Sequence, residues 1–347
     1  MRRLLVLCAA LICLYVLHYH GKDKAPEDTL PEDTHYEQPS QARQQPPTTQ
    51  QQRPLQPITN LTDSTLDKLR QQQLSQINKS RTSHGLSSVS LDDKASKVAQ
   101  RHCEAMVTGD FFGHTGLNGS RPFHRYNLDE GGDGHVAENI CLFKSSQAHA
   151  TDYKTMAELA AKGHGMFMAE VPPNDGHRQN ILEKWHNYVG IGVSVKGGSY
   201  TYCEEFLDKY IDISGPLSKT IPYGQKIEFT GAVISPGDFG LYMIAVTYDA
   251  ALVPPAKPQP SSYKDAGAHK AAILPPWDFN KDGMRYDKRS GKFSISIKME
   301  KKGYYYVVFY LKENPSSIPY EGARSNSSSA VSTNDGFVGG AQVIKIT

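Results

Sequence analysis

The chain has 347 residues, of which 38% are hydrophobic and 21% charged, and 38 basic against 36 acidic side chains leave a formal net charge of +2. This composition is that of an ordinary globular protein, and the length suffices for about two domains of usual size. The nearly balanced charge provides no general attraction to nucleic acid, so we expect no nucleic-acid partner.

The first residues have the pattern of an export signal. Arg2 and Arg3 precede an unbroken apolar run from Leu4 to Leu17, and a positive segment followed by a hydrophobic one is typical of a secretory signal. The run is shorter than the ~20 residues that span a bilayer, yet no clear small-residue cleavage site follows it. We predict a signal peptide at residues 1–20, with an uncleaved membrane anchor as the alternative. The protein is then either secreted or tethered to the outer side of a membrane.

Residues 21–59 differ sharply in composition from the rest. They are rich in proline, glutamine and acidic residues and include a glutamine run at Gln50–Gln52. Such a segment cannot bury enough apolar surface to order itself. We therefore predict a disordered linker here.

Helical patterns begin near Asn60. A second helix is expected from Leu91 to Thr108, where apolar side chains recur on one face. A third, from Tyr153 to Met168, must end by Val171, because two prolines follow and remove amide donors. A fourth, short helix is expected to start at Asp175, whose carboxylate would accept from the first free amides.

Two strands follow these helices. Val189–Val195 and Tyr200–Leu207 alternate around a glycine-containing turn, which is typical of a hairpin. Helices flanking a small sheet predict an α-β-α sandwich of layers for residues 60–210.

After about Ser214 the helical period disappears and short alternating runs replace it. They lie at Lys226–Val233, Leu241–Tyr248, Lys292–Met299, Tyr304–Leu311 and Ala341–Ile346. Several short strands with Pro/Gly-rich connections are typical of a β-sandwich. We predict an all-β, immunoglobulin-like domain at residues 215–347, with a long irregular insertion from Pro254 to Asp287, and hence an α+β protein overall.

The chain contains five cysteines. Cys8 and Cys13 lie in the export segment, which leaves Cys103, Cys141 and Cys203 in the folded part. One of these three must stay unpaired in a monomer. The strand-like contexts of Cys141 and Cys203 favour a disulfide between these two in an oxidising compartment, although the sequence leaves all three pairings open.

Four short strings each place one imidazole or carboxylate beside apolar neighbours. They contain His114, Glu138, Glu170 and His177. Two histidines and two carboxylates are ligand types that a borderline cation such as Zn²⁺ takes. A compact sandwich could bring the four together, but their spacing alone does not establish this. The zinc-protease, nucleophile-elbow and phosphate-loop strings do not occur in the sequence.

The order of these strings makes residues Leu66–Phe206, under half of the chain, resemble a bacterial-like CAP domain, also called an SCP domain. This superfamily comprises cysteine-rich secretory proteins, antigen 5 and pathogenesis-related proteins. The motifs that carry the resemblance are Ile77–Arg81 with His84–Leu86, Ala99–Met106 with Phe112–His114, Ala137–Ile140, Gly176–Leu182 and Val189–Val193.

The resemblance implies an α-β-α sandwich with a central cleft. The family's tetrad maps onto His114, Glu138, Glu170 and His177. In that family the two histidines often hold a divalent metal, frequently zinc, and the glutamates bind it or position water. Two departures weaken the match at Glu170: Phe167 stands where members commonly have tryptophan, and Val171–Asp175 replaces the Ser-Pro of many bacterial members.

With the resemblance, we predict an exported protein whose cleft holds a divalent metal and whose role is non-catalytic binding. Its partner would be a lipid or sterol, a protein, or the cell envelope. The alternative is a metal-dependent peptidase with Glu138 or Glu170 as general base, although two histidines fall short of the three protein ligands usual for catalytic zinc. A second alternative is a structural surface protein with a vestigial tetrad.

Overall fold

The computed structural model describes residues 61–216, 218–256, 269–279, 283–318, 320 and 336–347. The predicted signal peptide or anchor and the predicted linker, residues 1–59, lie outside this part of the chain. Within the described residues, no helix combines the length and apolar character needed to cross a membrane.

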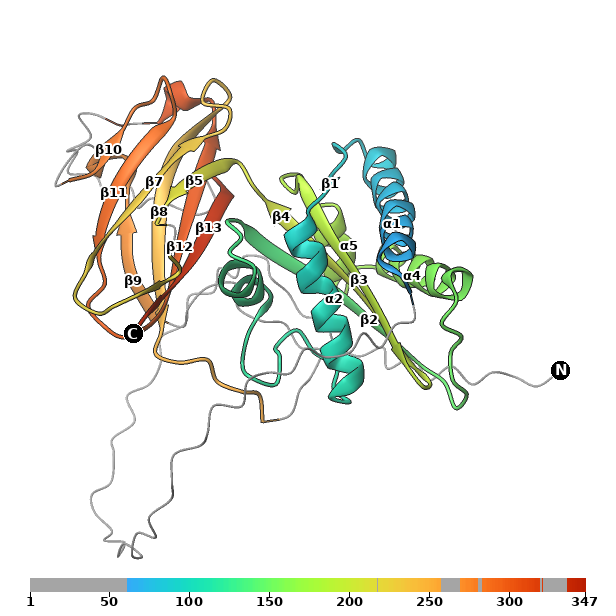
Figure 1. The fold of residues 1–347 in the computed structure, drawn as a ribbon. Coiled ribbons are helices and arrows are strands. Elements are labelled where there is room, and N and C mark those ends of the chain that lie inside the picture. Colours follow the sequence, from blue (N-terminus) through green and yellow to red (C-terminus); the bar gives the residue numbers. More distant parts are fainter. Residues whose placement is uncertain (1–60, 217, 257–268, 280–282, 319, 321–335) are drawn as a thin grey trace, which may run out of the picture.

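The N-terminal part is an α-β-α sandwich built on a four-stranded sheet (Figure 1). In spatial order the strands are β1 (Ser90–Leu91), β3 (Tyr188–Lys196), β4 (Ser199–Asp208) and β2 (His135–Lys144). The expected hairpin is β3 and β4, which pair antiparallel. The sheet ends at β2, and this edge position matters for the candidate site.

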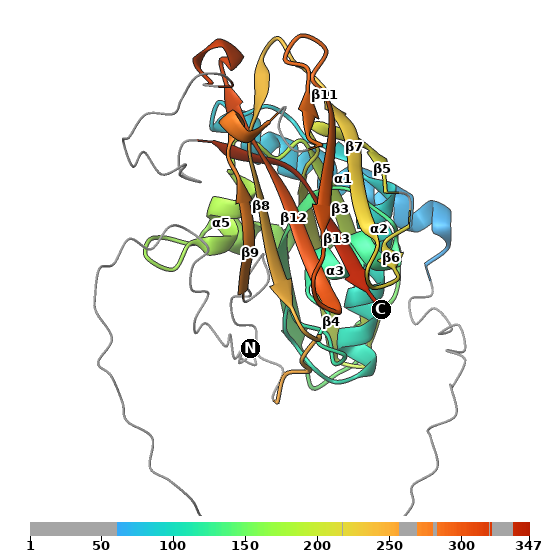
Figure 2. The same cartoon turned by 90° about the vertical axis from the view of Figure 1, so that its left-hand side faces the viewer.

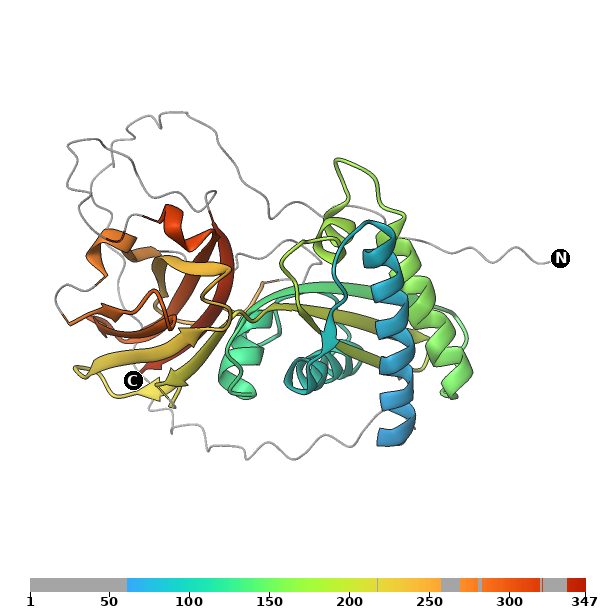
Figure 3. The same cartoon turned by 90° about the horizontal axis from the view of Figure 1, so that it is seen from above.

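Helices cover both faces of this sheet (Figure 3). On one face lies α2 (Asp93–Thr108), and on the other lie α1 (Asp63–Ser83) and α4 (Tyr153–Met168). Met168 ends α4 just before the two prolines, as predicted. The short helix α5 (Gly176–Ile181) follows.

Glycines let α2 approach the sheet closely. A Cβ on Gly190 would lie 2.2 Å from the carbonyl carbon of Ala95, and one on Gly192 would lie 2.2 Å from that of Ala99. No side chain fits at such distances. The glycines of the Val189–Val193 motif are therefore a packing requirement between β3 and α2.

The predicted disulfide between Cys141 and Cys203 is wrong. In the antiparallel β2–β4 pair, Cys141 is opposite Tyr202 and Cys203 is opposite Ile140. Because side chains alternate between faces, a register difference of one residue places the two cysteines on opposite sides of the sheet. Cys141 packs in the core beneath α1 and α4, whereas Cys203 packs beneath α2.

The C-terminal part consists of two sheets that face each other (Figure 2). One sheet has the order β10 (Arg285–Tyr286), β11 (Lys292–Lys298), β7 (Lys226–Val233), β5 (Ile211–Gly215). The other has the order β6 (Thr220–Ile221), β13 (Phe337–Ile346), β12 (Gly303–Glu313), β8 (Phe239–Asp249), β9 (His269–Leu274). Their inner side chains form one core, in which Phe229 and Phe293 of the first sheet meet Phe309 of the second.

All five strands expected in the C-terminal part are present. The segment from Pro254 to Asp287 is not wholly irregular, however, because its described residues contain β9 and β10. Both are short edge strands, and β9 joins the sheet by pairing with β8. Their stability comes from this pairing, which a local alternation pattern does not reveal.

The two parts share a core and polar contacts. Tyr306 of β12 and Val343 of β13 belong to the same buried cluster as Phe123 and Tyr126 of the N-terminal part. Trp185, in the loop after α5, stacks on Phe337 with ring centroids 3.7 Å apart. The C-terminal β-sheets therefore pack directly against the segment that follows α2.

Candidate functional site

The first half of the tetrad is a buried pair, His114 and Glu138. Their side chains come from the loop after α2 and from β2, and His114 Nδ1 lies 2.7 Å from Glu138 Oε1. Arg125 donates from Nη2 to the other oxygen, Oε2, at 2.6 Å. The Glu138 side chain is 0% exposed, so both of its oxygens are engaged by a neighbouring cation or imidazole away from solvent.

A third imidazole, His102 of α2, supports this pair. Its Nε2 lies 2.9 Å from the carbonyl oxygen of Gly113, the residue before His114, and 3.8 Å from Glu138 Oε2. Burial, followed by the charge of Arg125, lowers the pKa of His102 to about 3. His102 is therefore neutral near pH 7 and holds the loop that carries His114.

Charge in this half of the site is unevenly distributed between two carboxyl groups. Burial alone would raise the pKa of Glu138, but the interactions with the neighbouring His102 and with the Arg125 guanidinium, together with the hydrogen bond with His114, outweigh it and lower that pKa. Burial and the neighbouring Glu138 raise the pKa of Glu205, whose Oε1 lies 3.7 Å from Arg125 Nη2. Glu138 is thus ionised and Glu205 protonated.

The second half of the tetrad is His177 with Glu170. Glu170 Oε1 lies 2.5 Å from His177 Nδ1, and its Oε2 accepts from the backbone amides of His177 at 3.0 Å and Arg178 at 3.4 Å. The predicted capping role of Asp175 is wrong. Asp175 accepts from the side chain of Gln179 instead, and Glu170 satisfies the first amides of α5.

Phe167 occupies the place where the family commonly has tryptophan, and its ring fulfils a stacking role. It lies on the imidazole of His177 with centroids 4.4 Å apart and an interplanar angle of 26°. Glu170 and Phe167 therefore fix the orientation of this imidazole, Glu170 through its contact with Nδ1 and Phe167 by stacking on one face of the ring.

The two halves are linked around the edge of the sheet. Glu138 and Asn139 are consecutive on β2, so their side chains point to opposite faces. Asn139 Nδ2 donates to the carbonyl oxygen of His177 at 3.2 Å, and Asn180 Nδ2 donates to Asn139 Oδ1 at 2.9 Å. The structure thus arranges the four predicted residues as two His–Glu pairs that are connected through β2.

In each pair the imidazole, and not the carboxylate, is the group that would meet a divalent metal. In both pairs the carboxylate meets Nδ1, so Nε2 is the atom of His114 and of His177 that could meet a metal, and the glutamates would orient the rings. Across the described ranges, no group of three or more His, Cys, Asp or Glu side chains is arranged to hold a metal ion. A metal here would have two protein ligands, not the four predicted.

Sequence reasoning missed the residues that hold the tetrad in place. His102 and Asn139 lie within the matched motifs whereas Arg125 and Glu205 lie outside them, and the roles of all four depend on contacts between separate elements. The one available signal was the pair of acidic residues inside an apolar strand at Glu204 and Glu205, which indicates buried carboxyl groups needing partners.

Glu204 belongs to a second buried chain of hydrogen bonds, which meets the tetrad at Asn139, whose Nδ2 donates to Glu204 Oε2 at 3.1 Å. Glu204 Oε1 lies 2.7 Å from His164 Nδ1, and His164 Nε2 lies 2.9 Å from Ser80 Oγ. The order of groups is that of a nucleophile, base and acid. Ser80, however, lies in the last turn of α1, where the negative end of the helix dipole opposes an oxyanion. The chain is therefore a structural link between α1, α4 and β4.

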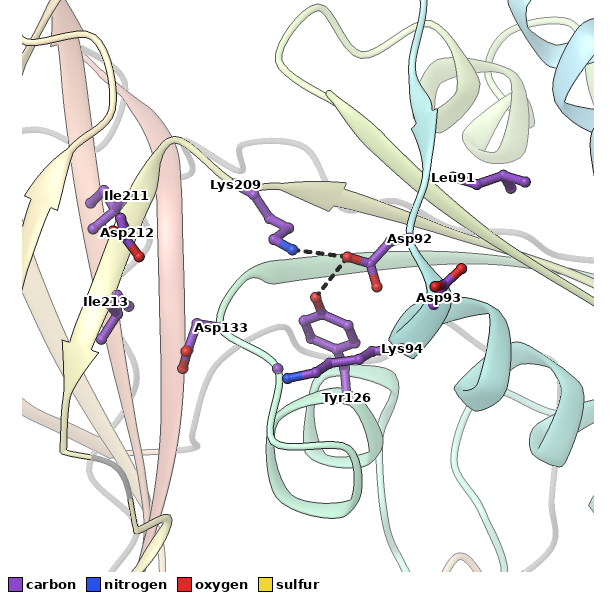
Figure 4. Close-up of a pocket in the computed structure, with 11 residues that line it drawn as sticks. Leu91, Asp92, Asp93, Lys94, Tyr126, Asp133, Lys209, Ile211, Asp212 and Ile213 are labelled. Carbon is purple, nitrogen blue, oxygen red and sulfur yellow. Dashed lines mark hydrogen bonds and ion pairs between the residues drawn. The ribbon is translucent and has the colours of Figure 1, made fainter.

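A cavity of about 420 Å³ lies between the two parts, away from the tetrad (Figure 4). Tyr126 and Lys209 both point at Asp92 and donate to its Oδ2 at 3.3 and 2.8 Å. Asp133, another lining residue, pairs with Lys219. The carboxylates of Asp92 and Asp133 are thus already paired with donors of the protein and do not require a ligand in the cavity.

Comparisons with known proteins found one family model and several solved structures that are similar to part of this chain. Residues 74–206 match the model of the cysteine-rich secretory protein family, CAP. An outer surface protein of Borrelia burgdorferi is 15% identical, with a TM-score of 0.33, and the match covers 44% of this chain and 98% of that one.

Two further solved structures are also similar to part of this chain. An extracellular protein from Bacillus anthracis that contains an SCP domain is 24% identical with a TM-score of 0.29, over 42% of this chain and 44% of that one. The CAP domain of enterococcal PrgA is 17% identical with a TM-score of 0.32, over 43% of this chain and 64% of that one. No curated protein matches the chain.

Proposed function

We propose that this chain, whose residues 74–206 match the CAP family model, is an exported binding protein whose tetrad orients a ligand site and performs no catalysis. The single observation that carries this proposal is that both tetrad carboxylates are fully engaged as hydrogen-bond acceptors. Glu138 meets His114 and Arg125, and Glu170 meets the ring and the backbone of His177.

A general base needs a free lone pair and a pKa near the working pH. Glu138 is poorly suited to this role, since its pKa lies below the usual range and each of its oxygens already faces a partner, Arg125 or His114. Glu170 is more exposed, but its two oxygens already accept from three donors at the start of α5. The predicted peptidase would have to break these contacts before it could activate water.

In this proposal His114 and His177 hold a divalent metal, with zinc as the first ion to test. A bound metal would supply a Lewis-acidic centre able to take an oxygen ligand from a partner molecule. Glu138 and Glu170 keep the two imidazoles oriented by accepting at Nδ1. Arg125 compensates the Glu138 charge, which limits the electrostatic attraction for a cation and predicts modest affinity.

The partner we propose is a lipid or sterol, with a protein or cell-envelope ligand as the alternative. Large apolar side chains are exposed next to both halves of the tetrad: Leu117, three residues after His114, is 53% exposed, and Val171, directly after Glu170, is 70% exposed. Exposed apolar groups beside a polar site suit a ligand with a polar head and an apolar body.

The test is zinc titration of the full chain by calorimetry. We expect a single-site signal in the wild type that is lost in the double variant His114→Ala/His177→Ala and kept in His135→Ala, a histidine of β2 outside both pairs. Absence of any zinc signal in the wild type would remove the metal from the proposal. A sterol or fatty-acid titration with no saturable signal would remove the lipid.

The hydrolase alternative is tested with the same proteins. Peptide turnover by the wild type that disappears in Glu138→Gln, with the fold retained by circular dichroism, would overturn the non-catalytic assignment. No turnover in either protein agrees with the binding role, whereas equal turnover in both would exclude Glu138 as the base and require the same comparison with Glu170→Gln.

We also propose that the C-terminal part, from about residue 215, is an immunoglobulin-like domain. Its first strand is split between the sheets, with β5 beside β7 and β6 parallel to β13. Near the start of β12 the hydroxyl of Tyr305 accepts from the backbone amide of Lys301 at 3.0 Å, which resembles the tyrosine corner of that fold. Val307, two residues later, is 0% exposed where such domains carry a cysteine.

A further inference from the structure

We propose that Cys103 and Cys203 form a disulfide when the chain folds in an oxidising compartment, by exchange with a small-molecule or protein disulfide. Cys103 lies in α2 and Cys203 in β4, and their Sγ atoms are 2.9 Å apart. Both side chains are 0% exposed. Closing the bond requires an approach of only about 0.9 Å to the usual S–S length, which side-chain rotation can supply.

The sheet decides which of the three cysteines pair. Cys203 points toward α2, where it packs with Cys103, Ala99 and Met106. Cys141 points to the opposite face and packs among the side chains beneath α1 and α4. A bond from Cys141 to either of the others would have to pass through the sheet, so the pairing left open by the sequence is determined by β-strand alternation.

The exchange proceeds in two balanced steps. The thiolate of one cysteine attacks the donor disulfide, forms a mixed disulfide and releases one donor thiolate, which takes a proton. The thiolate of the second cysteine then attacks the mixed disulfide and releases the other donor thiolate. The protein loses two hydrogens overall, and the donor disulfide is reduced to two thiols.

The bond must form before the core closes. Burial and the neighbouring Cys103 thiol raise the pKa of Cys203 in the folded protein, and the thiolate is the form that reacts. The folded, reduced protein would therefore react slowly, while a folding chain exposes both thiols. The resulting bond would close a loop between positions 100 residues apart, which restricts the unfolded chain.

The bond would also stabilise the loop that carries His114 in the candidate site. His102 is the neighbour of Cys103 on α2 and holds the carbonyl of Gly113 at 2.9 Å, one residue before His114. Fixing this turn of α2 to β4 fixes the base of the loop that carries His114. This inference does not depend on metal or lipid binding.

Peptide mapping of the full chain tests the pairing directly. The protein is refolded in a glutathione redox buffer, alkylated under denaturing conditions without reductant, and digested with trypsin. Each cysteine of the folded part lies on its own tryptic peptide, namely residues 102–125 for Cys103, 126–144 for Cys141 and 197–209 for Cys203. We expect the first and third peptides joined, about 2 Da lighter than the sum of their thiol forms, and the second alkylated.

Two results would overturn the proposal: alkylation of both Cys103 and Cys203 after oxidation, or a linkage of either one to Cys141. Matched variants give a second readout. In wild type and Cys141→Ala, a reductant should lower the urea midpoint by roughly 1 M, whereas Cys103→Ala/Cys203→Ala should not respond. An equal response in all three would contradict the pairing. The wild-type map remains decisive even if a variant fails to fold.

Discussion

Acid should weaken the contact between the two parts through one histidine, His124 of α3 (Pro122–His124). Its Nδ1 accepts from the backbone amide of Arg121 at 3.0 Å, so the ring proton resides on Nε2, where it is donated to the hydroxyl of Tyr306. Tyr306 in turn donates to Asp249 at 3.1 Å. A second ring proton would have to face the Arg121 amide, with its guanidinium close by.

The size of the effect follows from the difference between the pKa of His124 in the folded and in the unfolded chain. Burial, followed by the charges of Arg121 and Arg125, lowers the pKa of His124 to about 3, against ~6.5 in an unfolded chain. The unfolded state therefore binds the proton first, and stability falls as the pH drops from about 6.5 toward 3. At about 1.4 kcal/mol per unit, the loss is about 2 kcal/mol at pH 5 and at most about 5 kcal/mol at pH 3.

Urea unfolding at pH 7 and pH 5 checks this reasoning in the wild type and in His124→Gln, which cannot take up the proton. We expect the wild type to lose about 2 kcal/mol more than the variant between the two pH values. His102, whose pKa is also lowered to about 3, contributes equally to both proteins and cancels. An identical pH dependence in the two proteins would refute the assignment of a buried neutral His124.

Four further substitutions test the scaffold by urea unfolding. Arg81→Met should lower the free energy of unfolding by about 3–5 kcal/mol. The reason is that the buried guanidinium of Arg81 donates to four backbone carbonyls, three of them at residues 181, 183 and 186 beside α5. A loss below about 1 kcal/mol would contradict this. Gly192→Ala should lower the free energy of unfolding by at least about 2 kcal/mol, because it displaces α2. The control is Gly165→Ala, where a Cβ meets nothing within 4 Å; it should be neutral or stabilising by up to about 1 kcal/mol. Tyr305→Phe should cost about 1 kcal/mol, and no loss would count against the proposed tyrosine corner.

Local patterns predicted the helices and long strands because each carries its own periodicity and end signals. The third helix, Tyr153–Met168, has the bounds expected from its apolar face and the prolines that follow. Short strands such as β6 and β10 have two residues each and no pattern of their own. Their existence depends on a neighbouring strand, which the sequence does not place beside them.

The tetrad residues could be predicted from motif order, but the structural role of each one could not. Glu170 was the weakest match, yet it both caps α5 and holds His177. Asp175 carried the usual sequence signal for a cap and does not perform that role. Which of two nearby carboxylates reaches an amide depends on the path of the loop between them, and that path is set by tertiary packing.

The cysteine prediction failed for a related reason. Both Cys141 and Cys203 lie in strands, as expected, but pairing depends on which face each side chain occupies. That face follows from the β2–β4 register, and register is a property of two strands together.

The buried cluster shared by the two parts connects the C-terminal sheets to the candidate site in the N-terminal part. Tyr306 and Val343 pack against Phe123 and Tyr126, the residues that flank His124 and Arg125, and Arg125 is the partner of Glu138. The β-sheets thus act as a buttress for the segment that sets the charge of the tetrad. A homologous cleft without such a buttress would need another means to keep its arginine in place, so exchange of the second domain is a way to tune the first.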